Sequence, residues 1–325
     1  MPNALRHLVC SAVLLGGAVL YDVPPLMAVE PTIVIGTGPV AGTYFPAGGA
    51  ICTVYNRAFD GQGTGCVVRS TGGSLENLER LTRGEIDFAL IQSDWQYLAL
   101  NGGDVELGDK ARDLRAVFSL QAHTITILVH PDAGIETLED IKGRKVNLGP
   151  PGGGMRAAAE AFIGALGWSR DELGEVAELG MGEIAKALCA GQLDAAVLPV
   201  SHPNGAVAAA AAMCGARFLS VPEPVIARLS ADWPFYAPAQ IPAGLYAGQD
   251  QAVRSYGVRA TLVTLASMSD DTVFALTRAV FTDIPALAGQ HPALSYLVRN
   301  EMIEAGIVAE IHQGAAQFYR ELPRN

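Results

Sequence analysis

The sequence has 325 residues, with 22 Lys+Arg against 33 Asp+Glu, a formal net charge of −11, and 50% hydrophobic but only 17% charged residues. At about 150 residues per domain, this length predicts two domains, each able to bury its own core. The apolar fraction excludes a disordered chain. Basic residues cluster no further than the pair Arg144-Lys145, so no basic field is available for a phosphate backbone and we expect no nucleic-acid partner.

The N-terminus carries the one apolar run that approaches the length of a membrane span. Arg6 and His7 precede uncharged residues 8–20, and Asp22 and Pro24 close the run. A bilayer helix needs about 18 or more apolar residues, so the run fits a secretory signal better, with a buried core helix as the alternative. We expect a signal peptide over residues 1–28 and an exported mature protein.

Loss of residues 1–28 would remove Cys10 and leave four cysteines, Cys52, Cys66, Cys189 and Cys214. An even number in an oxidising compartment favours two disulfides, for which three pairings are possible. The sequential pairing closes two short loops, and four buried free thiols are the alternative. No Cys/His spacing indicates a metal site, and we expect none.

Strand, loop and helix patterns follow one another repeatedly along the chain. Short apolar, β-branched runs end in Gly-, Ser- or Pro-rich loops, after which the apolar spacing becomes helical. The strand-like runs cover 32–35, 66–69, 86–91, 146–148 and 195–198. Such alternation predicts an α/β fold with doubly wound, mainly parallel sheets, in which ligands bind beyond the carboxyl ends of the strands.

Two longer extended segments, 117–129 and 257–265, separate these units into groups. Two crossings of this kind would make the second domain an insertion within the first. We therefore expect lobe 1 to contain residues 29–122 and 256–325 and lobe 2 to contain residues 123–255.

The loops that follow the predicted strands carry the candidate ligand-binding residues. Glycine loops at helix N-termini present free N–H groups to an anion, and neutral hydroxyls and amides suit a small polar ligand. Any one of these residues could instead serve only as a turn or helix cap. The candidates are Thr43, Tyr44, Thr71, Gly73, Ser74, Gln92, Ser93, Gly153, Gly154, Arg156 and His202.

Catalytic and cofactor signatures are missing from the sequence. Gly36, Gly38 and Gly42 have the spacing G-x-G-x-x-x-G, without the acidic residue that a dinucleotide site requires. There is no G-x-S-x-G elbow, Walker A lysine or H-E-x-x-H motif. A triad assembled from a Ser, His123 or His202 and an Asp remains an alternative, which would make the protein a secreted hydrolase. We expect no enzymatic activity and no cofactor.

The loop motifs resemble those of one family, the TAXI solute-binding proteins of TRAP transporters. The resemblance covers the mature chain in order. It is carried by GTGPVAGTYFP (36–46), STGGSLEN (70–77), QSD (92–94), IPAG (241–244) and HQGAAQFY (312–319). It implies a periplasmic location and a two-lobed periplasmic-binding-protein-like fold. The ligand cleft lies between the lobes, which close on a small organic anion, an amino acid or a dicarboxylate such as glutamate. It also implies delivery to the sodium-dependent membrane permease subunits of a TRAP transporter.

Further consequences of the resemblance concern individual residues. The positions Cys52/Cys66 and Cys189/Cys214 look like the disulfide pairs of a cysteine-bearing branch of the family. In the second-lobe loop, Gly153 and Met155 replace polar residues common in the family, so the ligand does not transfer from it. Because Arg156 is the one fixed cation in these glycine loops, we expect it to face an acidic ligand group, with an exposed first-turn arginine as the alternative. A monomer is expected, and a receptor that presents its ligand to a sensor kinase is the alternative function.

Overall fold

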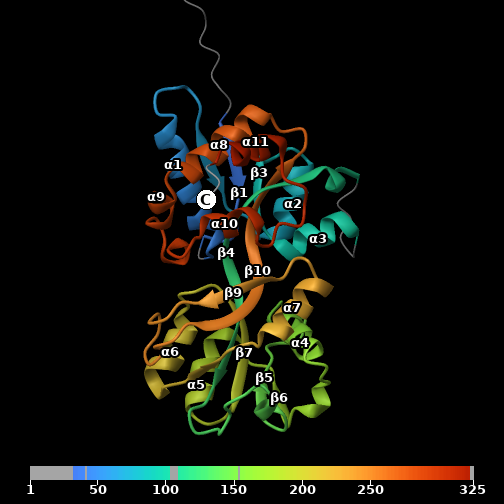
Figure 1. Ribbon diagram of the computed structural model, residues 1–325, viewed down its shortest axis with the longest axis vertical. Helices are drawn as coiled ribbons and strands as arrows, with labels where there is room; N and C mark the ends of the chain where they lie inside the picture. The colour runs from blue at the N-terminus through green and yellow to red at the C-terminus, as the bar shows by residue number, and fades with distance from the viewer. Residues whose placement is uncertain (1–31, 41, 103–108, 153, 323–325) are drawn as a thin grey trace, which may run out of the picture.

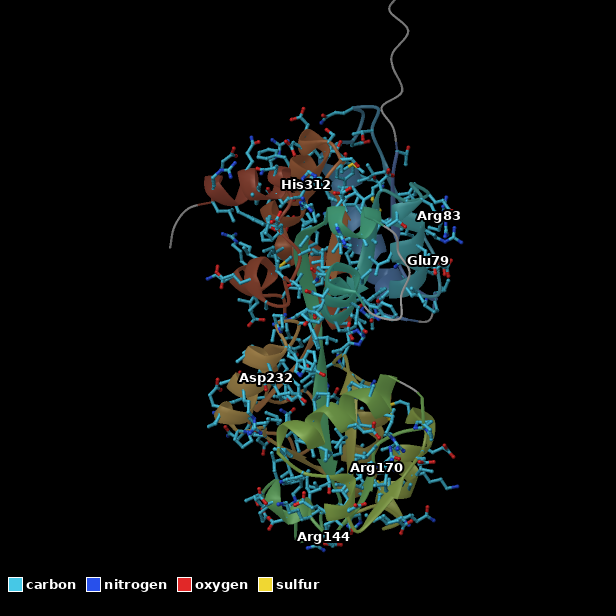
Figure 2. The ribbon with its side chains drawn as sticks, turned by 90° about the vertical axis from the view of Figure 1, so that its right-hand side faces the viewer. Glu79, Arg83, Arg144, Arg170, Asp232 and His312 are labelled. Atoms are coloured by element: carbon cyan, nitrogen blue, oxygen red, sulfur yellow. A yellow bond between two sulfur atoms is a disulfide. The ribbon has the colours of Figure 1, made fainter. Side chains whose placement is uncertain are left out.

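Two lobes joined by a pair of long strands make up the computed structural model, which describes residues 32–40, 42–102, 109–152 and 154–322 (Figure 1). The expected signal peptide, residues 1–28, lies outside the described residues, and so does Gly153. Figure 2, seen from the side, shows the same two lobes and the narrower region between them.

The first lobe is built from βα units at the N-terminus and from helices at the C-terminus. Its strands are β1 (Ile33–Gly36), β2 (Cys66–Arg69) and β3 (Phe88–Gln92). Its helices are α1 (Tyr44–Ala58), α2 (Ser74–Thr82), α3 (Ser93–Asn101), α8 (Asp270–Thr282), α9 (Ile284–Ala288), α10 (Arg299–Glu304) and α11 (Gln313–Glu321), with the 3-10 turns η1 (Asp109–Asp113) and η4 (Pro292–Leu294).

The second lobe repeats the arrangement. Its strands are β5 (Lys145–Asn147), β6 (Glu175–Ala177), β7 (Ala195–Val200), β8 (Arg217–Leu219) and β9 (Ala237–Ile241). Its helices are α4 (Gly154–Ala165), α5 (Met181–Cys189), α6 (Gly205–Cys214) and α7 (Glu223–Asp232), with the 3-10 turns η2 (Glu139–Ile141) and η3 (Arg170–Glu172).

The strands β4 (Leu114–Val129) and β10 (Val253–Leu265) pass from one lobe to the other. Within the lobes, β1 pairs in parallel with β2 and β3, and β5 pairs in parallel with β6 and β7. The long strands pair antiparallel with each other and with β3 and β7, which joins both groups into one ten-stranded sheet. The expected lobe boundaries fall inside these two strands and stay predictions.

Each lobe has its own apolar core, which fixes how the strand-end loops face the other lobe. In the first lobe, Phe118 on β4 and Phe281 on α8 are buried and meet edge to face. In the second, the fully buried Phe162 of α4 packs on the fully buried Tyr256 of β10. Burial of such large rings stabilises each core by roughly 2–3 kcal/mol per side chain.

Strand β9 is an element that the sequence pattern does not indicate, because Pro238 and the surrounding Pro/Gly-rich passage favour a loop. The structure pairs β9 with β10, and no other strand pairing of β9 occurs in the described residues. An edge strand tolerates proline because one side of it donates no ladder hydrogen bond. Helix α1 begins at Tyr44, and Pro46 is accommodated because it lies within the first helical turn.

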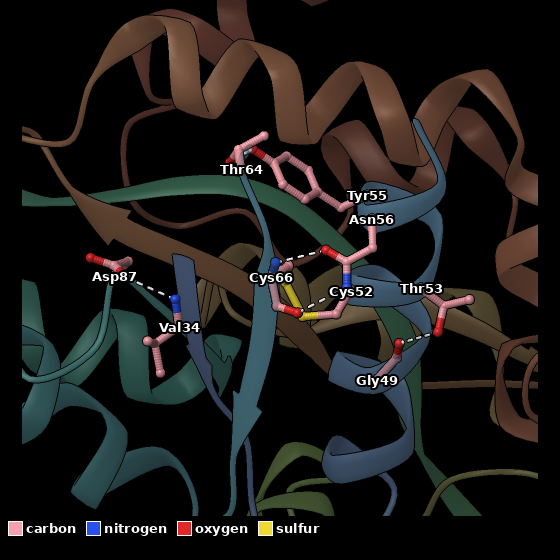
Figure 3. Close-up of a disulfide and its surroundings, with 9 residues drawn as sticks. All are labelled: Val34, Gly49, Cys52, Thr53, Tyr55, Asn56, Thr64, Cys66 and Asp87. Atoms are coloured by element: carbon pink, nitrogen blue, oxygen red, sulfur yellow. Dashed lines mark hydrogen bonds between the residues drawn. A yellow bond between two sulfur atoms is a disulfide. The ribbon is translucent and has the colours of Figure 1, made fainter. Parts of the chain in front are cut away.

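Both expected disulfides form. Cys52 in α1 bonds Cys66 at the start of β2, with Cα atoms 4.9 Å apart, and Cys189 of α5 bonds Cys214 of α6, with Cα atoms 5.3 Å apart. Asn56 supports the first bridge: its side chain donates to the Cys66 carbonyl at 3.0 Å and accepts from the Cys66 N–H at 2.7 Å (Figure 3). The sequential pairing is therefore confirmed.

Candidate functional site

A cavity of about 500 Å³ lies between the lobes. Its lining comes from the start of α3 in the first lobe, from the starts of α4 and α5 in the second lobe, and from β4 and β10, which connect the lobes. In Figure 1, α3, α4 and α7 lie to the right of these two strands. Its walls contain Gln92, Asp94, Tyr97, Leu98, His123, Ile125, Gly154, Met155, Ala157, Ala158, Met181, Pro199, Trp233, Phe235, Tyr236, Gly257 and Val258. This volume suits a small organic molecule.

Aromatic rings form one side of this cavity. Tyr97 of α3 meets Trp233 and Phe235 edge to face, with ring centroids 6.1 and 5.4 Å apart. Phe235 also contacts Tyr236, which meets the buried Tyr256 at right angles. Because these rings come from both α3 and the segment after α7, they form an apolar surface that spans the two lobes.

The polar side of the cavity centres on Asp94 and His123. The Asp94 carboxylate accepts the Trp95 N–H at 2.8 Å. Gln92 lies beside His123, with 3.3 Å between its amide nitrogen and Nδ1, and the Tyr44 ring packs edge-on against the imidazole at 5.9 Å. Within the described residues, His123 Nε2 is buried without a hydrogen-bond partner.

The electrostatics of this site follow from burial. Burial raises the pKa of Asp94 to about 6 and lowers the pKa of His123 to about 4, so the histidine is neutral near pH 7 while Asp94 is mostly ionised. Burial, and then the Asp94 charge, raise the pKa of Tyr44, which keeps its hydroxyl protonated and able to donate. Among the described residues of the cavity wall, Asp94 is the one carboxylate and no Lys or Arg occurs.

The structure brings several of the predicted residues to this cavity. Gln92 and Gly154 line it, and Tyr44 packs on its His123. Thr43 lies half-buried at the position before α1, without a side-chain capping bond. Ser74 accepts the Gln92 N–H at 3.2 Å and so holds the loop that carries the site.

Other predicted residues serve the framework. The Thr71 hydroxyl lies 2.7 Å from the Asn77 side chain and accepts the N–H of Gly73, which precedes α2 with φ 112°. Ser93 is fully buried; its hydroxyl donates to the Phe235 carbonyl at 2.7 Å and accepts the Arg259 N–H at 3.0 Å. These bonds fix the β2–α2 turn and tie α3 to the aromatic segment.

Arg156 does not line the cavity. It is 5% exposed; its Nε and one terminal nitrogen both donate to the Gly149 carbonyl, at 3.0 and 2.7 Å. The same nitrogen lies 2.9 Å from Glu178, and the other lies 3.5 Å from Glu160. The guanidinium therefore fastens the β5–α4 loop to the β6–α5 loop, in place of the expected contact with an acidic ligand group.

An Arg156→Ala variant is expected to lose about 2–3 kcal/mol of unfolding free energy, because the Gly149 carbonyl loses two charge-assisted bonds. Glu178 and Glu160 are 49% and 43% exposed, so water can solvate their carboxylates in the variant and the loss should not exceed this range. Urea unfolding measures it. Arg170→Ala is the control, since Arg170 is 52% exposed on the outside of the same lobe (Figure 2) and should change stability by less than about 0.5 kcal/mol. Weaker ligand binding at an unchanged free energy of unfolding would instead show that Arg156 contacts the ligand.

His202 also lies outside this cavity. It is 9% exposed; Nε2 is 2.9 Å from the Thr126 hydroxyl and Nδ1 is 2.6 Å from the Tyr246 hydroxyl. Burial lowers its pKa to about 4. The ring lines a second cavity on the other side of the long strands.

The aromatic side of the site is absent from the residues predicted from the sequence. Trp233, Phe235 and Tyr236 follow α7, at the start of the Pro/Gly-rich passage, and only the fold brings them opposite Tyr97. The dense aromatic run around Pro234 was the available signal. Asp94 can be read from the sequence as a helix cap, but its position in the wall of a cavity between lobes cannot.

Two properties of the described residues bear on other classes of protein. No helix in this part of the chain has the length and apolarity needed to cross a bilayer. Nor does the described part bring together three or more His, Cys, Asp or Glu side chains in an arrangement that could hold a metal ion.

Comparison with known proteins identifies the family and the fold. The profile of the NMT1-like family matches residues 35–322, most of the chain, which therefore belongs to this family. The chain is similar to the crystal structure of a TctC solute binding protein from Polaromonas, with a TM-score of 0.55, 16% identity, and 89% of this chain and 94% of that chain covered. It is also similar to the periplasmic aliphatic sulphonate binding protein SsuA from Escherichia coli, with a TM-score of 0.47, 16% identity and coverages of 91% and 94%. The expected α/β, periplasmic-binding-protein-like fold is confirmed.

Proposed function

We propose that this NMT1-like protein is a periplasmic solute receptor that captures a small amino acid between its lobes and delivers it to the membrane subunits of a transporter. It performs no catalysis in this proposal. The observation that carries it is the cavity between the lobes, which combines one ionised carboxylate with an aromatic wall. Closure of the lobes would bury the ligand and create the form that membrane subunits bind.

The chemistry of the cavity wall favours an amino acid over a dicarboxylate. Asp94 attracts an ammonium group, and the described part of the wall has no cationic side chain to neutralise two carboxylates. One carboxylate is accommodated by the starts of α4 and α5, where Gly154 and Met181 line the cavity, because first-turn N–H groups carry partial positive charge. The aromatic wall then contacts the amino-acid side chain.

The transporter assignment rests on the sequence motifs. Their resemblance to TAXI solute-binding proteins favours the sodium-dependent permease of a TRAP transporter as the partner. The two disulfides support export, because such bonds persist in oxidising compartments. A gene for permease subunits beside this one would support transport, whereas a neighbouring sensor-kinase gene would support ligand presentation.

A melting-temperature screen of amino acids, dicarboxylates and polyols tests the proposal. An amino acid at 100 times its dissociation constant is expected to stabilise the protein by about 2.7 kcal/mol, which raises the melting temperature by several degrees. Dicarboxylates without an amino group should give no shift. A shift with dicarboxylates alone would overturn the ligand class, and release of product from ester or amide substrates would overturn the receptor function.

A further inference from the structure

A second cavity, of about 360 Å³, lies against the same two strands and shares no wall residue with the first among the described residues. Ala122 and Thr124 of β4 line the second cavity, whereas His123 and Ile125 line the first. Successive side chains of a strand point to opposite faces, so the two cavities lie on opposite faces of the sheet. The strands that connect the lobes thus separate two cavities.

Both lobes build the walls of the second cavity. Gln240 and Pro242, from β9 and the loop after it, come with His202 from the second lobe, and η4, α10 and the segment between them come from the first. Apolar groups, among them Ala239, Leu297 and Val298, cover much of this wall. Any change in the angle between the lobes must therefore change the shape of this cavity.

A β-bulge turns one polar side chain toward the second cavity. Arg259 and Thr261 of β10 pair with Ala122 and Ser119 of β4, so β4 has one extra residue in this stretch. Such an insertion interrupts the regular alternation of the strand and redirects a side chain. Gln121 consequently lines the same cavity as its neighbour Ala122.

Gln121 lacks hydrogen-bond partners in the described structure. The residue is 6% exposed, and both its amide nitrogen and its amide oxygen are buried without a partner. Arg259, also 6% exposed, donates to the Leu120 carbonyl at 3.1 Å and pairs with the Glu301 carboxylate, while its Nε has no partner. Buried polar atoms are normally satisfied, so these three atoms indicate a molecule that belongs in the cavity.

We propose that the second cavity is a binding site for a small neutral molecule with a carboxamide group. The carboxamide exchanges two hydrogen bonds with the Gln121 amide, whose donor and acceptor lie side by side. Arg259 and Glu301 neutralise each other, so the wall carries no net charge from this pair that would select an ion. The apolar remainder of the ligand contacts the alanine and leucine side chains.

This site is expected to act on the main cavity, a consequence that rests on the proposed function. Because both lobes contribute walls to both cavities, a carboxamide that binds better to one lobe arrangement changes the affinity of the amino acid. By linkage the amino acid must change the affinity of the carboxamide by the same factor.

Benzamide is the probe for the test, titrated into the mature protein by calorimetry and by NMR of backbone amides. We expect saturable binding with a dissociation constant of about 1 mM or below, with the largest shifts at residues of the second cavity. Gln121→Leu should weaken it at least 10-fold, and Gln121→Glu, which removes the amide donor, should do the same. Gln317→Leu, on the exposed face of α11, is the matched control and should leave binding unchanged.

Two results would overturn the proposal. Absence of saturable benzamide binding would mean that only water fills the cavity, and equal affinity in a folded Gln121→Leu variant would place the probe elsewhere. Benzamide titrated into Asp94→Asn separates this site from the main one, because benzamide binding should persist there. If Asp94→Asn loses amino-acid binding but keeps benzamide binding, the two ligands occupy separate sites.

Discussion

Asp94→Asn is expected to weaken binding of the amino-acid ligand by about 2 kcal/mol or more, which is roughly 30-fold in dissociation constant. The substitution removes the one carboxylate that the described cavity wall offers to an ammonium group. Asparagine keeps the size of the side chain and can still accept the Trp95 N–H, so the start of α3 should be preserved. Calorimetric titration with the best amino acid from the screen gives the dissociation constants.

The control variant is Asp232→Asn, which removes the same charge from the exposed end of α7, outside the cavity wall (Figure 2). Its affinity should equal that of the wild type. If both variants lose affinity equally, a long-range charge effect is responsible; if neither does, Asp94 does not meet the ligand.

The pH dependence provides a second readout of the same residue. Since the pKa of Asp94 is raised to about 6, wild-type affinity should fall as the pH drops through 6, and Asp94→Asn should lack this fall. The sign for the unliganded protein is opposite. Because the folded-state pKa lies above the ordinary 3.8, the free energy of unfolding of the wild type should decline as the pH rises from about 4 to about 6 and Asp94 ionises. The variant should not show this decline.

Local sequence signals were sufficient for the βα units and the loops between them. The β-branched run at Ile33 and the Leu78 and Leu81 spacing are properties of short segments, and these residues pack in one lobe as buried strand and helix residues. Of the three possible disulfide pairings, the sequential one closes two short loops, of sequence separation 14 and 25, and the family resemblance implies the same pairs.

The distribution of charge in the site depends on contacts that no local pattern encodes. Arg156 looked like a ligand cation because it follows a glycine loop, but its partner Glu178 lies 22 residues further along the chain. Burial raises the pKa of Asp94 to about 6, and Asp94 lies in the wall of a cavity whose lining residues are far apart in the sequence. The charged side chain in the described cavity wall is therefore the Asp94 carboxylate and not the Arg156 guanidinium, and of the two expected ligand classes we propose the amino acid for this reason.

Removal of both disulfides is expected to cost about 6 kcal/mol of unfolding free energy, about 3 kcal/mol for each in the loop-entropy model. The paired variants are Cys52→Ala with Cys66→Ala, and Cys189→Ala with Cys214→Ala. The bridges lie in different lobes, so their effects should add within about 0.5 kcal/mol.

The Cys52–Cys66 bridge gives the clearer test of the loop-entropy model. The two Asn56 hydrogen bonds remain when Cys52 and Cys66 are alanine, so the folded contact between α1 and β2 persists and the loss arises mainly in the unfolded chain. Urea unfolding should then show a lower midpoint. The amino-acid affinity of the folded variant should stay unchanged, because neither bridge lines the cavity. A loss of affinity equal to the loss of stability would show instead that the bridge shapes the native site.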